Sequence, residues 1–482
     1  MSIKKRVSYR LIYRIGALLC LLVSATSHAI FVSPQPMPLD RLIANTEKRI
    51  AANGKDPLGY YVLGRLHYLA FINEVSFVRA YRHSNQNSYP AVQSYYLDQA
   101  GGYNREQRRK DIAYSLRYLE AQRLVVEKRG FTSLSDAYDS FKPTNQFDVK
   151  EQFEKKQAFR QEIQDKSIEL ETLGWEPPRL SEAELHQHAL LARQAFERAI
   201  ELDHNHALAL LGIASLFEQY LDFVGDQPDS NSIKGMDDVF PYKVRQAYFK
   251  AHNAAYKKDK AHSNVPMRGM RALVSWEAGK AYERHVRALG TRASPKEELA
   301  YVTVRRHLDV LEKIPPARAI TPIVFSLTPR ANFSELIDNS LNVKFDLSGY
   351  GQGSSWPWVK PETAFLVYDQ NGDGRIESAR DMFGSYTFKI PFANGYQALS
   401  LLDNNSDGEL AGTELEGISA WFDINSDGVS DPGEVIPIQG FGVLGISTEF
   451  SVETTSYLHN PSGLRLKGGQ FLATWDWFAT PN

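Results

Sequence analysis

The C-terminal part of the chain contains two acidic stretches of the same pattern, DNNSDGELAGTE at residues 403–414 (loop 2) and DINSDGVSDPGE at residues 423–434 (loop 3). A related stretch, DQNGDGRIESARD, stands at residues 369–381 (loop 1), and all three begin with D-x-N-x-D-G. Calcium takes about six to eight oxygen ligands. A loop of this pattern offers them as side chains at positions 1, 3 and 5, a carbonyl at 7 and a carboxylate at 12, with Gly at 6 making the turn. The sequence therefore predicts calcium-binding loops.

Loops 2 and 3 contain every ligand position. In loop 2 the predicted ligands are Asp403, Asn405, Asp407, the carbonyl of Glu409 and the closing carboxylate of Glu414. In loop 3 they are Asp423, Asn425, Asp427, the carbonyl of Val429, Asp431 and Glu434. Loop 3 has four carboxylates where loop 2 has three, so we expect loop 3 to bind calcium more tightly.

Loop 1 departs from the pattern at its end. Its predicted ligands are Asp369, Asn371, Asp373, the carbonyl of Arg375, and Glu377. Position 12 is Arg380, a cation that cannot coordinate, and Asp381 follows one residue late. We expect a weaker or differently closed site here, and two to three Ca²⁺ ions in total.

The alternative for any single loop is an Asp- and Asn-rich turn without a metal, since these residues favour turns for their own reasons. Three matches together favour calcium, and a Glu at position 12 is not needed by a turn. Residues 341–450 carry sixteen acidic and five basic residues, a net charge of −11. Bound cations would relieve the repulsion among these acids.

The residues at position 8 and the number of residues between the loops predict how the three loops are arranged. Ile376 and Leu410 are apolar at position 8 of loops 1 and 2, so we expect these two loops to pair through a short strand. Loop 3 begins only 20 residues after loop 2, and we expect a helix over 415–422 to join them.

The residues around the loops read as strands. Short apolar or alternating runs at 323–327, 341–345 and 364–368 follow Pro315-Pro316, which places a boundary near residue 315. Gly468-Gly469 predicts a hairpin near the end of the chain. We expect Trp356, Trp358, Trp475 and Trp477 in the core rather than in a sugar-stacking platform.

Residues 39–311 are dominated by helical signals. The clearest helix spans 181–202, with Ser181 and Glu184 as a capping box and an apolar face from Leu185 to Ile200. Two His-x-His pairs, at 186/188 and 204/206, are expected to be solvated, because side chains two apart on a helix point away from each other.

Two resemblances follow from these residues. The small and large residues of 192–214, together with Leu63-Gly64, resemble a degenerate tetratricopeptide array, which implies stacked helical hairpins that bind a protein or peptide partner. An irregular helical bundle is the alternative. Residues 343–450, with Phe345-Asp-Leu347, the three loops and Gly395-Tyr-Gln-Ala-Leu399, resemble an EF-hand- or dockerin-like calcium-binding module of secreted bacterial proteins.

The first residues predict export. Five basic residues precede the apolar run 15–23, and Ser27-His28-Ala29 suits signal cleavage. An uncleaved anchor is the alternative. Cys20 is the only cysteine of the 482 residues, so the chain after Ala29 would enter the periplasm or the outside without disulfides and without a membrane span. The overall net charge of −2 gives no reason to expect nucleic acid.

The sequence thus predicts a signal peptide (1–29), an all-α tetratricopeptide-like domain (30–314) and an α+β calcium-binding module (315–482). We expect an exported calcium-binding protein whose loops stabilise the module. The alternatives are a secreted or periplasmic enzyme such as a hydrolase with an accessory calcium module, and a scaffold with vestigial loops. No G-x-S-x-G, H-E-x-x-H, phosphate-loop or dinucleotide motif supports the enzyme.

Overall fold

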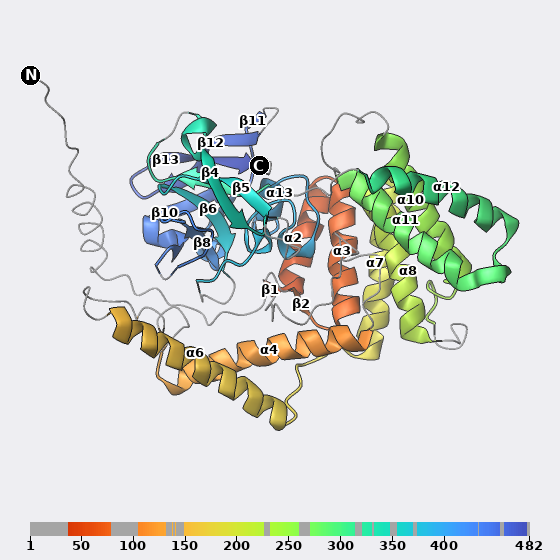
Figure 1. Cartoon of the computed structure of the whole chain (residues 1–482), viewed down its shortest axis with the longest axis horizontal. Coiled ribbons are helices and arrows are strands. Elements are labelled where there is room, and N and C mark those ends of the chain that lie inside the picture. The colour runs from red at the N-terminus through yellow and green to blue at the C-terminus, as the bar shows by residue number, and fades with distance from the viewer. Residues whose placement is uncertain are drawn as a thin grey trace, which may run out of the picture.

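A computed structural model describes residues 37–78, 105–131, 137, 140, 149–225, 232–259, 270–313, 321–329, 332–347, 354–369, 374–431, 433–453 and 457–479. The predicted signal peptide and the predicted boundary near residue 315 lie outside these residues. The described chain forms a helical N-terminal region and a C-terminal antiparallel β half-barrel (Figure 1). The coarse division into an α part and a β-containing part is confirmed.

The helical region contains long helices. They are α2 (Leu39–Ala52), α3 (Pro57–Asn73), α4 (Arg105–Lys128), α6 (Val149–Thr172), α7 (Glu182–Leu202), α8 (Ala207–Val224), α10 (Pro241–Asp259), α11 (Met270–Leu289) and α12 (Pro295–Leu311). The helix predicted over 181–202 is confirmed as α7, and its capping box between Ser181 and Glu184 is formed in both directions.

Phe196 of α7 is the packing centre of this region. Its ring is fully buried, and it lies so close to Gly64 of α3 and Gly212 of α8 that a Cβ at either glycine would come within 2.7 Å of it. The two glycines are therefore needed for close approach of the backbone, and the large ring fills the space they leave. Helices α3, α7 and α8 form one unit around this contact.

Helices α4 and α6 have a hydrophobic core separate from that unit, although Arg108 of α4 bonds to Gln219 of α8 at 2.7 Å. They pack on each other around a small core of their own, which includes Val125, Phe159 and Ile163. In Figure 1 this pair runs below the rest of the molecule, so the helical region is not one continuous stack of hairpins.

The expectation that the paired histidines are solvated is wrong for most of them. His186 is buried beside the Tyr220 hydroxyl, at 3.1 Å from its Nδ1 atom. The Nδ1 atoms of His188 and His67 lie 2.9 Å apart, and burial, followed by the His188 charge, lowers the pKa of His67 to about 4. His206 accepts the Ala209 N–H as a helix cap. Burial also lowers the pKa of His186 and His188, so these rings act as structural groups within the fold rather than as solvated side chains.

Helix α8 is long and apolar enough to cross a bilayer by length and composition, and it is the one such helix among the described residues. Within the fold it is a core helix, because 61% of it is buried inside the protein.

The half-barrel is an antiparallel sheet with the strand order β7-β10-β12-β13-β3-β6-β8-β9, and β11 pairs with β12. Its strands are β3 (Ile323–Ser326), β6 (Thr363–Tyr368), β7 (Glu409–Ala411), β8 (Ile418–Trp421), β9 (Val435–Pro437), β10 (Val443–Ser447), β11 (Val452–Glu453), β12 (Tyr457–Leu466) and β13 (Phe471–Trp477). Strands β4 (Ile337–Phe345) and β5 (Ser354–Val359) form a separate hairpin, and β1 (Met37–Pro38) pairs with β2 (Phe77–Val78).

The strand predictions at 323–327, 341–345 and 364–368 are confirmed by β3, β4 and β6. The hairpin at Gly468-Gly469 joins β12 to β13, and both glycines have positive φ, which suits the turn. The four tryptophans expected in the core are buried there, none more than 4% exposed.

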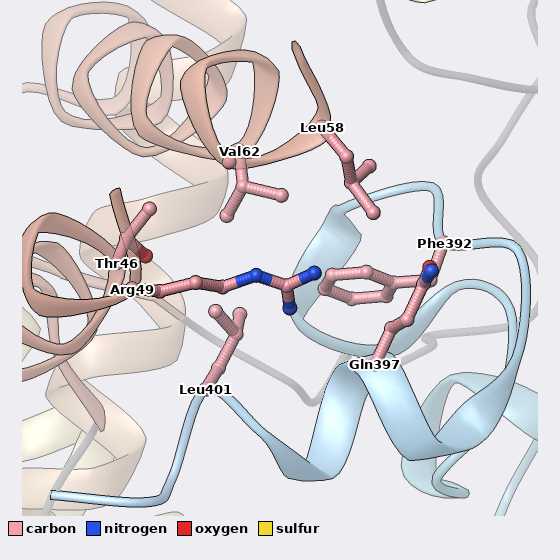
Figure 2. Close-up of a pocket in the computed structure, with 8 residues that line it drawn as sticks. Thr46, Arg49, Leu58, Val62, Phe392, Gln397 and Leu401 are labelled. Atoms are coloured by element: carbon pink, nitrogen blue, oxygen red, sulfur yellow. The ribbon is translucent and has the colours of Figure 1, made fainter. Parts of the chain in front are cut away.

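Helices α2 and α3 lie between the half-barrel and helices α7, α8, α10, α11 and α12 (Figure 1), and one continuous hydrophobic core runs through the half-barrel and these helices. Figure 2 shows part of this junction, where Arg49 extends from α2 toward Phe392, with Leu401 on one side and Val62 on the other. The pocket there is lined by Thr46, Arg49, Leu58, Gly59, Val62, Phe392, Gln397 and Leu401. The segment just before loop 2 is thereby placed against the helical region.

Candidate metal centre

Loop 2 folds around the carboxylates of its first and last positions. Asp403 accepts the N–H groups of Ser406 at 2.7 Å and Gly408 at 2.9 Å. Glu414 accepts the N–H of Asn404 with Oε1 at 2.6 Å and that of Ala411 with Oε2 at 2.9 Å. Both carboxylates are 6% exposed. The two ends of the loop are thus joined through backbone donors.

Loop 3 repeats this arrangement. Asp423 accepts the Gly428 N–H at 2.8 Å, and Glu434 accepts the N–H groups of Ile424 at 2.8 Å and Asp431 at 2.9 Å. Each bond has its counterpart at the same loop position in loop 2. Two stretches that share a sequence pattern therefore share a conformation.

The backbone turns of the two loops also correspond. Position 4 is a serine with positive φ in each, 59° at Ser406 and 56° at Ser426. Gly408 and Gly428 at position 6 have φ of 86° and 74°, and Gly374 of loop 1 has 68°. Left-handed backbone at position 6 explains why each loop has glycine there. Such a turn directs the oxygens of positions 1, 3 and 5 toward the loop interior.

The remaining side chains of loops 2 and 3 bond mainly within their loops. Asn405 and Asn425 accept the N–H groups of Asp407 and Asp427 at 3.0 and 3.2 Å. Asp407 and Asp427 accept those of Glu409 and Val429 at 2.9 and 2.8 Å. Each oxygen of a carboxylate or amide has two lone pairs, so these bonds leave acceptor capacity for a cation.

The residues proposed as carbonyl ligands at position 7 turn their side chains elsewhere. Glu409 forms an ion pair with Arg465, with oxygen–nitrogen distances of 2.7 and 2.8 Å. Val429 is 55% exposed. Asp431, at position 9 of loop 3, accepts the side-chain amide of Asn425 at 3.1 Å and so faces the other predicted ligands.

Burial makes the charges of loop 3 costly. The Asp423 side chain has no exposed area, and burial raises the pKa of its carboxyl. Burial also raises the pKa of Glu434, and the nearby charge of Asp423 adds to the effect. Asp423 accepts the indole N–H of Trp358 at 2.6 Å. Backbone and indole N–H groups are the donors to the Asp423 and Glu434 carboxylates, which would repel each other when both are ionised. A bound cation would reduce this repulsion and the cost of burying the two charges.

Loop 1 shares part of this geometry. Asp369 accepts the Gly374 N–H at 3.0 Å, as its counterparts do in the other loops. Asp381 accepts the N–H groups of Glu377 at 3.0 Å and Ser378 at 3.1 Å, so it takes the place of the missing Glu at position 12. Arg375 pairs with Glu377 at 2.8 Å. The predicted ligands Asn371 and Asp373 lie outside the described residues.

The predicted pairing of loops 1 and 2 is wrong. The Ile376 N–H donates to the Ser430 hydroxyl of loop 3 at 2.8 Å, so position 8 of loop 1 meets position 8 of loop 3. Leu410 instead lies in β7 and pairs with Ile446 of β10. The polar serine at position 8, which gave no reason to expect pairing, supplies the contact.

The helix predicted over 415–422 is also wrong. Residues Ile418–Trp421 form β8, fully buried between β6 and β9. A four-residue apolar run has no periodicity to separate helix from strand, and two neighbouring strands decide the outcome.

The fit to calcium depends on more than carboxylates. No group of three or more His, Cys, Asp or Glu side chains is placed to hold a metal among the residues that the structure describes. A cation in loop 2 or 3 would therefore need the Asn amide oxygens, the position 7 carbonyl and water as well, which is the mixed oxygen set that calcium takes.

Sequence reasoning missed two residues beside the loops. Trp358, from β5, donates to Asp423 across 65 positions, and Asn404 receives side chains from α2. Both contacts join distant segments, so no local pattern could have shown them.

Comparison with known proteins places the family match in the half-barrel. A family model described as the SPM domain matches residues 333–469. The chain is also similar to the iron-regulated protein FrpA of Neisseria meningitidis serogroup C, with 30% identity over 129 residues. That match covers 26% of this chain and 12% of FrpA, so the chain spans a small part of that relative.

These findings correct both resemblances seen in the sequence. No EF-hand or dockerin model matches the C-terminal region, which is mostly an antiparallel half-barrel: loop 3 connects β8 to β9, and loop 2 contains β7. The tetratricopeptide resemblance is likewise wrong: the match lies in the half-barrel, and α4 and α6 form a separate pair with its own core. In both cases a short sequence motif matched a known family locally, but the surrounding structure is not that of the family.

Proposed function

We propose that this chain is an exported calcium-binding protein in which loops 2 and 3, and more weakly loop 1, bind two to three Ca²⁺ ions that stabilise the half-barrel. The observation that carries the proposal is the repeated geometry of loops 2 and 3. In each, the carboxylates of positions 1 and 12 are at least 94% buried and converge on backbone donors of the same positions.

The role we propose for calcium is structural. Extracellular calcium modules have dissociation constants of about 10⁻⁴ to 10⁻³ M, which suits a compartment with millimolar calcium. Loop 3 joins β8 to β9, which pair with each other, so an ion bound there would fasten two neighbouring strands in place of a disulfide. Loop 2 contains β7, at the opposite end of the sheet, so an ion bound there would fix that edge strand.

Terbium luminescence tests this proposal directly. The Trp358 indole bonds to Asp423, so Tb³⁺ in loop 3 would be excited by energy transfer from a tryptophan next to it. Glu434→Gln should reduce this signal strongly, whereas the matched change Glu414→Gln in loop 2 should reduce it little. Competition by excess Ca²⁺ should abolish the signal. No sensitised emission from the unaltered chain would refute binding in loop 3.

For the helical region we propose a protein or peptide partner. Leu299, Val302 and Val310 of α12 support this, since they are 71%, 53% and 47% exposed along one helix face. Changing Leu299 and Val302 to Asp should weaken partner binding without unfolding the chain, because neither side chain contributes to the core. An unchanged partner affinity would exclude this face. No contact among the described residues favours the hydrolase alternative.

A further inference from the structure

Helix α2 docks on the segment that enters loop 2. Four of its side chains, at spacings that place them on one face, reach across to residues 400–404. The bonds are Arg41 to the Leu402 carbonyl and the Asn404 side-chain oxygen (both 2.9 Å), Asn45 to the Leu401 carbonyl (2.8 Å) and the Asn404 side-chain oxygen (3.0 Å), Lys48 to the Asn404 carbonyl (2.6 Å) and Arg49 to the Ser400 hydroxyl (3.2 Å).

Asn404 is the centre of this contact. Its side-chain oxygen and its carbonyl accept from three residues of α2, while its own N–H donates to Glu414 at 2.6 Å. Asn404 is position 2 of the loop, and Glu414 is the predicted closing ligand. A single residue therefore joins the helical region to the carboxylate that would hold the ion.

Loop 3 provides an internal comparison. Its position 2 is Ile424, whose N–H makes the equivalent bond to Glu434 at 2.8 Å, but whose side chain is 61% exposed. Two loops of the same conformation thus differ at the same position: one touches the helical region and the other faces solvent.

From this difference we propose that cation binding in loop 2 and docking of helix α2 stabilise each other, so that loop 2 fastens the helical region to the half-barrel when it is filled. This inference rests on the calcium binding proposed above. A cation bound by Glu414 and Asp403 fixes the backbone of 403–414, and Asn404 within it presents the side-chain and carbonyl oxygens that Arg41, Asn45 and Lys48 recognise. Docking in turn holds the empty loop in its binding conformation.

Charge opposes this coupling only weakly. Calcium would reduce the attraction between Arg41 or Lys48 and the acidic loop. However, every bond given above ends on a neutral amide, carbonyl or hydroxyl oxygen, and exposed charge pairs contribute little. Docking therefore depends on loop conformation, and the coupling is positive.

The test uses the full chain carrying Glu434→Gln, which silences loop 3, and calcium titration calorimetry to follow loop 2. In that background Asn404→Ala, and separately Arg41→Ala on the helix side, should weaken the loop 2 binding step by about 5- to 150-fold, the usual range of coupling between sites. Ile424→Ala, the same position in loop 3, should leave it unchanged. Because Asn404→Ala and Arg41→Ala change opposite sides of the contact, either variant tests the coupling if the other fails to fold.

Hydrogen exchange supplies the reciprocal measurement. Calcium should slow exchange in residues 39–52 of the unaltered chain and of Glu434→Gln, but not of Glu414→Gln. Equal calcium affinity with and without the Arg41 and Asn404 side chains, together with calcium-independent exchange in α2, would overturn the coupling while leaving calcium binding intact. Failure of the Glu434→Gln chain to bind any calcium would instead remove the proposed function of loop 2 and the coupling with it.

Discussion

Asp476 of β13 gives the half-barrel a pH dependence whose size follows from its surroundings. The side chain is 4% exposed, and its carboxyl accepts the Gly395 N–H at 3.2 Å. Burial raises the pKa of this carboxyl from 3.8 to about 7. Each unit of pKa shift corresponds to about 1.4 kcal/mol, so ionising Asp476 in the folded protein costs about 4 kcal/mol.

The sign follows from proton uptake. Between pH 4 and 7 the folded chain holds the Asp476 proton and the unfolded chain loses it, so the free energy of unfolding falls as the pH rises through this window. Asp476→Asn retains an acceptor oxygen for Gly395 but cannot ionise. We expect the variant to match the unaltered protein near pH 4 and to exceed its stability by up to about 4 kcal/mol at pH 8.

Denaturant unfolding in saturating calcium, from pH 4 to pH 8, measures this difference. Glu449→Gln, at an exposed position after β10, is the matched control and should follow the unaltered protein throughout. Parallel pH profiles for the Asp476→Asn and unaltered proteins would show that burial does not hold the proton on this carboxyl.

Three further predictions concern the loops and the helical core. Removal of about 1 mM calcium with a chelator should lower the stability of the half-barrel by about 0.4 to 1.4 kcal/mol per site for the dissociation constants expected above, measured by thermal unfolding; equal melting with and without chelator would contradict this. Asp423→Ala should remove one calcium-binding event in calorimetry, whereas a full set of binding events would exclude loop 3 as a site. Phe196→Ala should destabilise the helical region by about 3 to 5 kcal/mol in denaturant unfolding, since Gly64 and Gly212 cannot fill the cavity; a loss below about 1 kcal/mol would show that the helices collapse around it.

Features set by neighbouring residues were predictable from the sequence. The capping box of Ser181 and Glu184, the glycine turn at 468–469 and the strands at 323–327 and 364–368 all depend on residues within a few positions. The conformations of loops 2 and 3 are also predictable from the sequence, because the glycines and the side-chain acceptors of each loop act on backbone only a few residues away.

Features set by distant contacts were not predictable. Ile418–Trp421 is a strand because β6 and β9 flank it, and Ile376 bonds to Ser430 because the sheet brings loops 1 and 3 together. A larger error came from the resemblance of the loops to an EF-hand- or dockerin-like module, which the family match and the half-barrel contradict. A twelve-residue loop specifies its own turn, but the elements on either side of it depend on the surrounding core.

We propose that oxygen-rich turns of the half-barrel hold calcium. Equilibrium dialysis of the full chain in millimolar calcium, followed by elemental analysis, counts the bound ions. We expect two to three ions per chain, falling by one when Glu434 is changed to Gln and by one more when Glu414 is changed as well. A chain recovered without calcium would contradict it.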